Sequence, residues 1–148
     1  MIIEYQTRLY DLREERNLTQ QKAALLLKTS RQNYSVWETN NKFIPLKHLN
    51  NYCNVFNVSM DYVFKLDNFR GNTINKKYTL NKKIIGENLN KLMKEKNITQ
   101  QELADFLNTT QSTISAYING KTLILTAFLY QIAKKYKVSM DYICGREK

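Results

Sequence analysis

The chain has 148 residues, of which 43% are hydrophobic and 24% charged, a balance typical of globular proteins and sufficient for one ordinary domain or two very small ones. It contains only four Gly and one Pro, which favours helices and argues against sandwiches and barrels, because these folds need more turn residues. The formal net charge of +10 is typical of a protein that meets a polyanion or an acidic surface, and the alternative is that the lysines only solvate the surface. The charge is uneven: residues 1–67 carry 9 basic and 7 acidic side chains, whereas residues 68–148 carry 14 and 6.

The chain is expected to begin with two short helices. Leu9 and Leu12 mark an amphipathic helix over about residues 5–16. Thr19 is a suitable N-cap for a second helix that ends at about residue 27, because a Thr hydroxyl accepts a hydrogen bond from the first turn.

A third helix is expected over about residues 31–39, after a break near Lys28 and an N-cap at Ser30. Tyr34 and Trp37 lie three residues apart on it and form a stripe that a helix would bury. Stacking of Trp37 on nucleic acid is the alternative, but this spacing favours packing in the core.

Two further helices are expected to complete the first unit. Pro45 suits the first turn of a helix over about residues 45–56, where its missing N–H costs nothing, and Ser59 caps a short fifth helix. Met60, at the start of that helix, is expected to pack in the hydrophobic core. His48 has no Ser, Cys or carboxylate pattern around it, so we interpret it as a surface or packing residue rather than a base or a metal ligand.

A polar segment with Gly71 in it follows and is typical of a linker. Lys76, Lys77, Lys82 and Lys83 add positive charge around it, and we expect the linker lysines to lie near the DNA backbone if the chain binds DNA. The predicted organisation is a first domain at residues 1–66, a basic polar linker at 67–80 and a second domain at 81–148.

The second domain repeats the first. Asn-Leu-Thr-Gln-Gln at residues 17–21 returns as Asn-Ile-Thr-Gln-Gln at residues 97–101, and Val-Ser-Met-Asp-Tyr stands at both 58–62 and 138–142. The same offset of 80 residues separates both pairs, so the chain holds two copies of one unit of roughly 60 residues, a size that folds alone. Thr99 and Glu102 form a capping-box pattern, which supports the second helix of this copy.

Helices two and three of each copy have the dimensions of a DNA-reading pair. They are short and separated by a few residues, a spacing that lets one cross the DNA backbone while the next lies in the major groove. In the second copy Ile114 and Tyr117 form the stripe to be buried. The side chains off the two stripes are amides, hydroxyls and a guanidinium, which reach base edges and phosphates: Arg31, Gln32, Asn33 and Ser35, and Gln111, Ser112, Thr113 and Ser115.

The order and spacing of these motifs resemble the phage-repressor-type (Cro/CI-like, XRE) helix-turn-helix family. The resemblance covers nearly the whole chain. It implies an all-α fold of two tandem five-helix, lambda-repressor-like helix-turn-helix domains joined by a short linker. The residues that carry the resemblance are 97–104, 110–115, 119–121 and 138–142 in the second copy, and 18–21, Ala24, 30–35, Trp37, Glu38 and 58–62 in the first.

The resemblance also implies roles for single residues. The Gln that opens the second helix, Gln20 or Gln100, would contact phosphate or the end of the site. The first three residues of the third helix would read bases, and the polar turn after that helix would touch the DNA backbone. The base-reading residues are then Arg31, Gln32 and Asn33 with Gln111, Ser112 and Thr113, and the turn residues are Asn40, Asn41 and Lys42 with Asn119 and Lys121.

Two positions depart from the family pattern. The family often has Gly after the third helix, where the first copy has Asn40, a residue that tolerates left-handed dihedrals less well than Gly but better than most. Ile118 stands in the second copy where the first has the acidic Glu38. This difference either marks a partner surface in the second copy or has no meaning.

Other classes of site have little support. Cys53 and Cys144 are the only cysteines and form no CxxC pair or Cys/His cluster, so no metal is expected, and such distant thiols suit a reducing cytoplasm. The N-terminus lacks the features of a signal peptide, and the most apolar window, residues 123–133, is too short and too polar to span a bilayer. No carboxylate pair, nucleophile motif or glycine loop points to an enzyme, a cofactor or a small-molecule substrate.

The sequence therefore predicts a cytoplasmic regulator of transcription that binds double-stranded DNA with sequence specificity. The alternative is that one copy binds DNA while the other is a protein-interaction module, for homodimer formation or for capture of a toxin or another regulator. The lower charge of the first copy and Glu38 favour that copy for this role, whereas Arg31, Gln32 and Asn33 argue against it. Because the reading residues differ between copies, a single chain is expected to read two unlike half-sites in successive major grooves.

Overall fold

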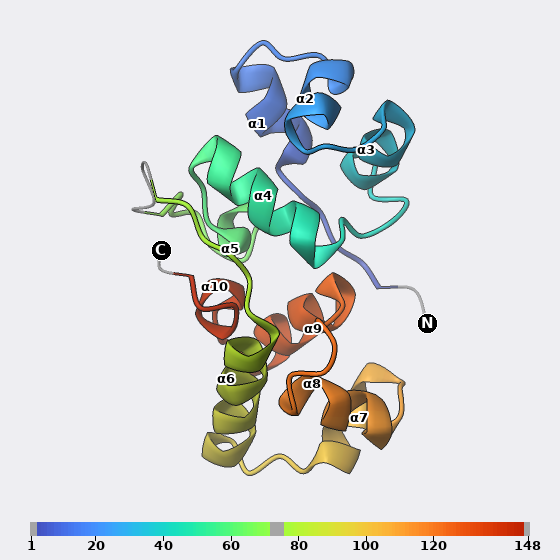
Figure 1. The fold of residues 1–148 in the computed structure, drawn as a ribbon, viewed down its shortest axis with the longest axis vertical. Coiled ribbons are helices and arrows are strands. Elements are labelled where there is room, and N and C mark those ends of the chain that lie inside the picture. Colours follow the sequence, from blue (N-terminus) through green and yellow to red (C-terminus); the bar gives the residue numbers. More distant parts are fainter. Residues whose placement is uncertain (1–2, 72–75, 147–148) are drawn as a thin grey trace. The chain divides into compact units, whose positions relative to one another are not determined.

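The computed structural model describes residues 3–71 and 76–146, and these residues form ten α-helices with no strand among them (Figure 1). The chain divides into two compact units, of which the first ends at Tyr78 and the second runs from Thr79 to Arg146. The all-α fold with five helices in each unit is as the sequence predicts. The first unit holds α1 (Leu9–Glu15), α2 (Gln20–Leu26), α3 (Arg31–Glu38), α4 (Leu46–Phe56) and α5 (Met60–Val63), and the second holds α6 (Lys82–Glu95), α7 (Gln100–Leu107), α8 (Gln111–Ile118), α9 (Thr126–Tyr136) and α10 (Met140–Ile143).

Polar N-caps start the short helices at the predicted positions. The hydroxyls of Thr19 and Ser30 each accept a hydrogen bond of 3.1 Å from the backbone N–H three residues further on. In the second unit Thr99 and Glu102 form the predicted capping box, with reciprocal hydrogen bonds of 3.1 and 3.3 Å. Helices this short are marginal in isolation, so these caps and the core beneath them define where each one starts.

The two units pack their cores in the same register. Met60 and Met140, which lie 80 residues apart in the sequence, are both fully buried, as predicted. Cys53 and Cys144 are both buried, so they pack as small hydrophobic side chains. The repeat in sequence is thus a repeat in packing.

The first helix differs between the two units. α6 begins at Lys82 behind an N-cap at Asn81, whose side chain accepts hydrogen bonds from two backbone N–H groups. α1 begins only at Leu9 and so lacks about the first two turns of α6. The predicted start near residue 5 is therefore wrong for the first unit. The chain before α1 is not helical, and Tyr5 instead stacks on Phe43 with ring centroids 3.8 Å apart.

A glycine explains this difference. A Cβ atom on Gly86 would lie 2.4 Å from the carbonyl oxygen of Tyr117 and 2.5 Å from that of Ile118, so only glycine lets α6 lie directly on the end of α8. The corresponding residue of the first copy is Gln6. If α1 were as long as α6, a side chain at that position would clash with the corresponding carbonyl groups of α3. The chain is therefore not helical there.

A buried ion pair joins α1 to α3 in the first unit. Arg13 donates to Glu38 through Nη2 at 2.7 Å and through Nε at 2.9 Å, and the two side chains are 8% and 3% exposed. A third donor, Nη1 of Arg13, reaches the carbonyl oxygen of Leu18 at 2.7 Å. Burial opposes ionisation of Glu38, but the hydrogen bonds and the charge of Arg13 outweigh it and hold the pKa of this carboxyl below its ordinary value of 4.5.

The second unit replaces this ion pair with apolar residues. Met93 stands at the position of Arg13 and Ile118 at that of Glu38, and Met93 is buried. The exchange of Glu38 for Ile118 is therefore accounted for by the interior of each unit. Glu38 is not available to a protein partner, contrary to the expectation from its place in the sequence.

The segment after α5 packs against the first unit. The backbone N–H of Ser59 donates to the carbonyl oxygen of Arg70 at 2.7 Å. The guanidinium of Arg70 forms an ion pair with Glu15 at 2.8 Å and lies over the ring of Tyr62 at 5.4 Å. Much of the segment expected to be a linker is thus bound to the first unit. Residues 72–75 of that segment lie outside the described residues.

Tyr78 is bound to α4 through its backbone. Its carbonyl oxygen accepts hydrogen bonds from Asn50 at 2.8 Å and from Asn54 at 2.9 Å, and its N–H donates to Asn54 at 3.1 Å. α6 is capped by Asn81, so only three residue steps join the bound part of the first unit to the second unit. Such a tether spans at most about 11 Å, far less than the roughly 50 Å of a free linker of about 15 residues.

Candidate nucleic-acid interface

The second and third helices of each unit are joined by a short turn of the same conformation. Lys28 follows α2 with a φ of 57°, and Asn108 follows α7 with a φ of 58°. This left-handed residue ends the helix and turns the chain toward the N-cap of the next helix. The break predicted near Lys28 is therefore present, and its counterpart in the second unit has a left-handed residue as well.

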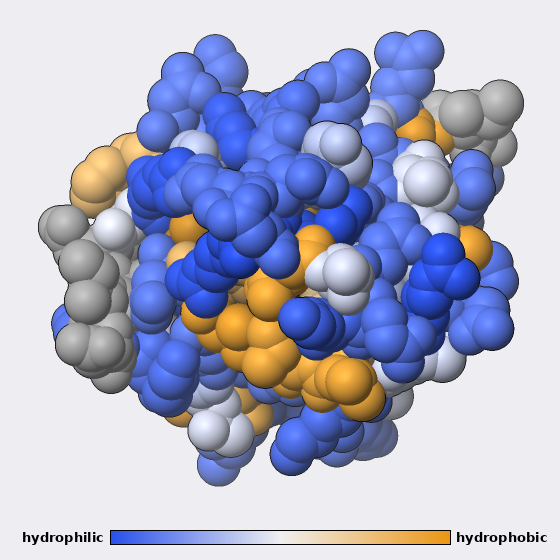
Figure 2. All heavy atoms as spheres, turned by 90° about the horizontal axis from the view of Figure 1, so that it is seen from above, coloured by the Kyte–Doolittle hydropathy of each residue, from blue (hydrophilic) through white to orange (hydrophobic). Residues whose placement is uncertain are grey.

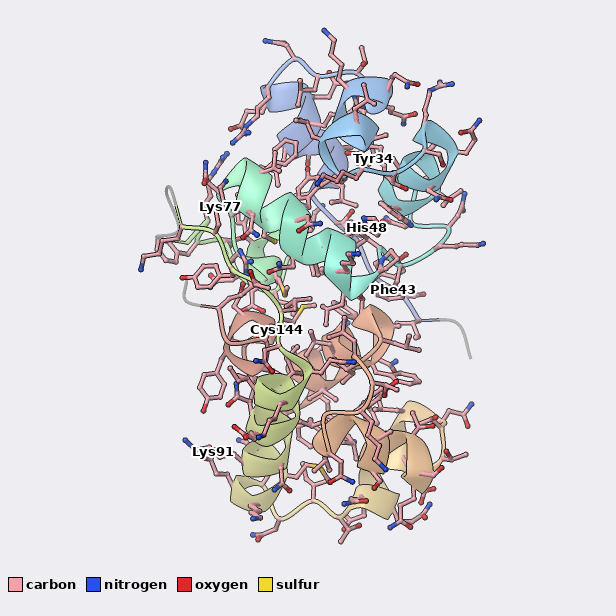
Figure 3. The ribbon with its side chains drawn as sticks, in the orientation of Figure 1. Tyr34, Phe43, His48, Lys77, Lys91 and Cys144 are labelled. Atoms are coloured by element: carbon pink, nitrogen blue, oxygen red, sulfur yellow. The ribbon has the colours of Figure 1, made fainter. Side chains whose placement is uncertain are left out.

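The inner face of each third helix is apolar and buried. In α3 the relative exposure is 0% for Tyr34 and 5% for Trp37, and in α8 it is 0% for Ile114 and 5% for Tyr117. The ring of Trp37 also packs on that of His48, with centroids 4.9 Å apart (Figure 3 labels Tyr34 and His48). Trp37 and Tyr117 thus pack in the core, as their spacing predicts, and His48 is a packing residue.

The outer face of each third helix is polar and accessible in its first turn. The residues there face away from the core, because the apolar stripe holds the opposite face of the helix against it. Further along, Ser35 and Ser115 are half-buried. Of the six predicted base-reading residues, Thr113 is half-buried. The other five are exposed: Arg31, Gln32, Asn33, Gln111 and Ser112.

Two of these side chains are held by local hydrogen bonds. Asn33 donates from Nδ2 to the hydroxyl of Thr29 at 3.2 Å. The hydroxyls of Thr110 and Thr113 lie 2.9 Å apart and share a hydrogen bond. These bonds fix the orientation of one polar side chain in the first turn of each third helix.

The glutamines that open α2 and α7 have different surroundings. Gln20 is half-buried, and its Nε2 lies 3.4 Å from Oε1 of Glu38, so the buried ion pair orients its amide. Gln100 is half-buried as well, but the second unit has Ile118 in place of that carboxylate. The amide of Gln20 is therefore more constrained than that of Gln100.

The turn after the third helix has a left-handed residue in both units. Asn40 has a φ of 61° and Gly120 a φ of 70°. The side chain of Asn40 accepts a hydrogen bond from Thr7 at 3.3 Å, so it is directed at its own unit. The other predicted turn residues are exposed and form the edge of the candidate interface: Asn41 and Lys42 in the first unit, and Asn119 and Lys121 in the second.

Two features of this region were not predicted from the sequence. One is the close contact of Gly86 with the end of α8, for which the available signal was a glycine inside an amphipathic helical pattern. The other is the position of Lys82, whose Nζ lies 3.5 Å from the carbonyl oxygen of Lys121. Both arise because the long α6 lies against the turn that follows α8.

Other kinds of site find no support in the described part of the chain. Within residues 3–71 and 76–146, no three His, Cys, Asp or Glu side chains are grouped so that they could hold a metal ion. Of the helices that the structure describes, none has the length and apolar character needed to cross a membrane.

Comparison with known proteins assigns a family to each half of the chain. A family model described as helix-turn-helix matches residues 89–143, and a second, described as a helix-turn-helix domain, matches residues 7–68. The chain is also 32% identical over 65 residues to antitoxin PezA of Streptococcus pneumoniae serotype 4. That alignment covers 44% of this chain and 41% of the antitoxin, so the chain spans about two fifths of the length of this relative.

Proposed function

The chain contains two helix-turn-helix domains of the phage-repressor (XRE) type, and from this premise we propose that it regulates transcription by binding double-stranded DNA with sequence specificity. The observation that carries the proposal is the exposed polar first turn of α3 and of α8. Each is backed by a buried apolar stripe and preceded by a second short helix. A helix held in this way enters the major groove with its first residues at the base edges.

The chemistry of the two first turns differs, which favours two unlike half-sites. Arg31 is the residue type that pairs in a bidentate manner with guanine, whereas Gln111 is of the type that pairs with adenine. The tether of at most about 11 Å between Tyr78 and Asn81 restricts how far apart the two units can move. We therefore propose that one chain accepts two unlike half-sites over a narrow range of spacings.

Replacement of single reading residues tests the proposal. Arg31→Ala is expected to cost about 1–3 kcal/mol of binding free energy at the preferred sequence and to relax the choice of base at one position, because a bidentate contact is lost. Gln111→Ala is expected to do the same at a position in the other half-site. The measurement is the affinity of each variant for a panel of duplexes with single base-pair changes.

Lys76→Ala is the matched control, because it removes the same charge from the first unit outside the helix pair. It is expected to lower the affinity for all duplexes alike. An Arg31→Ala variant with the preference and affinity of the original chain would show that α3 does not read bases.

A second candidate function is favoured by the resemblance to a protein named an antitoxin. In this case the first unit would bind another protein. Leu25 and Leu26 of α2 are 66% and 48% exposed, while the second unit has Asp105 and Phe106 at these positions. Figure 2, which views the molecule from the top of Figure 1, shows a group of apolar side chains on the surface that it presents. If Arg31→Ala leaves DNA binding unchanged, this candidate is the better one for the first unit.

A further inference from the structure

The helix pair of the second unit has no positive charge of its own. Residues 99–118 contain no Lys or Arg and include the acidic Glu102 and Asp105. The helix pair of the first unit, by contrast, carries Lys22, Lys28 and Arg31. Contacts between cations and phosphates supply most of the sequence-independent affinity for DNA. If the second unit binds DNA, as the proposed function requires, its cations have to come from outside α7 and α8.

The first turn of α6 places two lysines beside the turn that follows α8. Lys82 and Lys83 are exposed, and Nζ of Lys82 lies 3.5 Å from the carbonyl oxygen of Lys121. A Cβ atom on Gly120 would lie 3.0 Å from the Cα atom of Lys83, so the two backbones are in direct contact. Three exposed lysines therefore lie on adjoining backbone segments at the edge of the candidate interface. We call Lys82, Lys83 and Lys121 the lysine cluster.

The location of this cluster is unfavourable for the helix that carries it. Cations repel the positive end of the helix dipole, and the first turn of α6 holds no acidic residue to offset them. The first copy has Ile2 and Ile3 at the corresponding positions, so the lysines belong to the second copy alone. They lie on the turns of α6 that only the glycine contact at Gly86 allows to pack on α8. Stability of the helix does not account for the two lysines, whereas an anionic ligand would.

We propose that the lysine cluster binds the phosphate backbone of duplex DNA and supplies the positive charge that α7 and α8 lack. The contact is to phosphate, so it adds affinity without adding a preference for sequence. It also fixes the register of α8 on the duplex, because the turn after α8 and the start of α6 then contact the same stretch of the DNA backbone. This inference rests on the proposed DNA binding of the second unit.

The test compares two double variants of the full chain. Lys82→Ala/Lys83→Ala removes two charges from the cluster, and Lys91→Ala/Lys134→Ala removes two exposed charges elsewhere in the second unit. Lys91 points away from α8 in Figure 3, and Lys134 lies in the last turn of α9, at the end remote from Lys121. Affinity for a duplex of random sequence is measured over a series of KCl concentrations, and circular dichroism checks that each variant is folded.

The cluster variant is expected to flatten the slope of log affinity against log salt by about 1.8, since each phosphate contact contributes about 0.9. The control variant is expected to change the slope much less, and Lys82→Arg/Lys83→Arg to retain the original slope. Equal changes in the two alanine variants, or no change in the cluster variant, would overturn the phosphate assignment and leave the proposed function intact. Failure of the unmodified chain to bind duplex DNA at any salt concentration would instead overturn the proposed function.

Discussion

Glu38→Ala is expected to destabilise the first unit by about 3–5 kcal/mol, because it leaves the guanidinium of Arg13 buried without its carboxylate. Arg13 is only 8% exposed and directs two of its donors to Glu38. The carbonyl oxygen of Leu18 accepts the third donor but provides no charge. Glu14 lies 3.1 Å from the same nitrogen, but its side chain is 52% exposed, so water weakens its interaction with Arg13. The loss is therefore mainly that of the buried carboxylate partner rather than of a surface ion pair.

The chain offers a direct probe of this effect. Trp37 is the only tryptophan, it is 5% exposed and it precedes Glu38, so its fluorescence in a denaturant titration reports on the first unit. The double variant Arg13→Met/Glu38→Ile copies the residues of the second unit and is expected to regain most or all of the lost stability, since an apolar pair replaces a buried ion pair without leaving a charge. A double variant as unstable as Glu38→Ala would show that the ion pair is not the cause.

The same ion pair sets an acid limit for the first unit. Its carboxyl has a pKa below the ordinary 4.5 in the folded chain, so the folded state binds fewer protons than the unfolded state in that range. The stabilisation is fully present above pH 4.5 and is lost as the pH falls through the lowered pKa. The Arg13→Met/Glu38→Ile variant is expected to lose less stability over that range than the original chain.

Gly86→Ala is expected to destabilise the second unit by about 3 kcal/mol, the upper end of the range for overpacking. In an exposed helix the same change is favourable, because Ala has the higher helix propensity. Here the new methyl group would lie 2.4 and 2.5 Å from two backbone carbonyl oxygens of α8, which cannot move as a side chain does. The clash should outweigh the gain in propensity and force α6 away from α8.

The readout separates the two units. Far-ultraviolet circular dichroism is expected to show part of the helical signal melting earlier, while the fluorescence of Trp37 keeps its original transition. Glu87→Ala is the matched control, since it changes the neighbouring exposed residue of the same helix and should have little effect. A Gly86→Ala variant that melts at or above the original temperature would contradict the close contact described for α6 and α8.

Local signals in the sequence predicted most of the fold and of the candidate site. N-caps such as Thr19 and Ser30 bind the first turn of the helix that follows them, so a segment of four residues is enough to predict where that helix starts. The buried stripe of Tyr34 and Trp37 follows from helical spacing alone, and it places Arg31 on the outer face. These features are short-range, and each copy of the repeat supported the other.

What the sequence did not predict depends on contacts between residues distant in the chain. The late start of α1 depends on whether residue 6 or 86 fits against the third helix, and the burial of Glu38 depends on Arg13, which lies 25 residues away. The anchoring of Tyr78 depends on two asparagines of α4 that appear in the sequence as ordinary polar residues. No pattern of propensity or period records such pairings.

Selection of bound duplexes from a random library tests most directly whether the chain reads DNA through both copies. The full chain is compared with one variant in which the first-turn residues of α3 are replaced by alanine and one in which those of α8 are replaced. We expect the full chain to enrich two unlike half-sites within a narrow range of spacings, and each variant to lose the half-site of its own helix. Absence of any enriched sequence, or a perfect palindrome unaffected by loss of one helix, would contradict this account. The replaced residues are Arg31, Gln32 and Asn33 in the first variant and Gln111, Ser112 and Thr113 in the second.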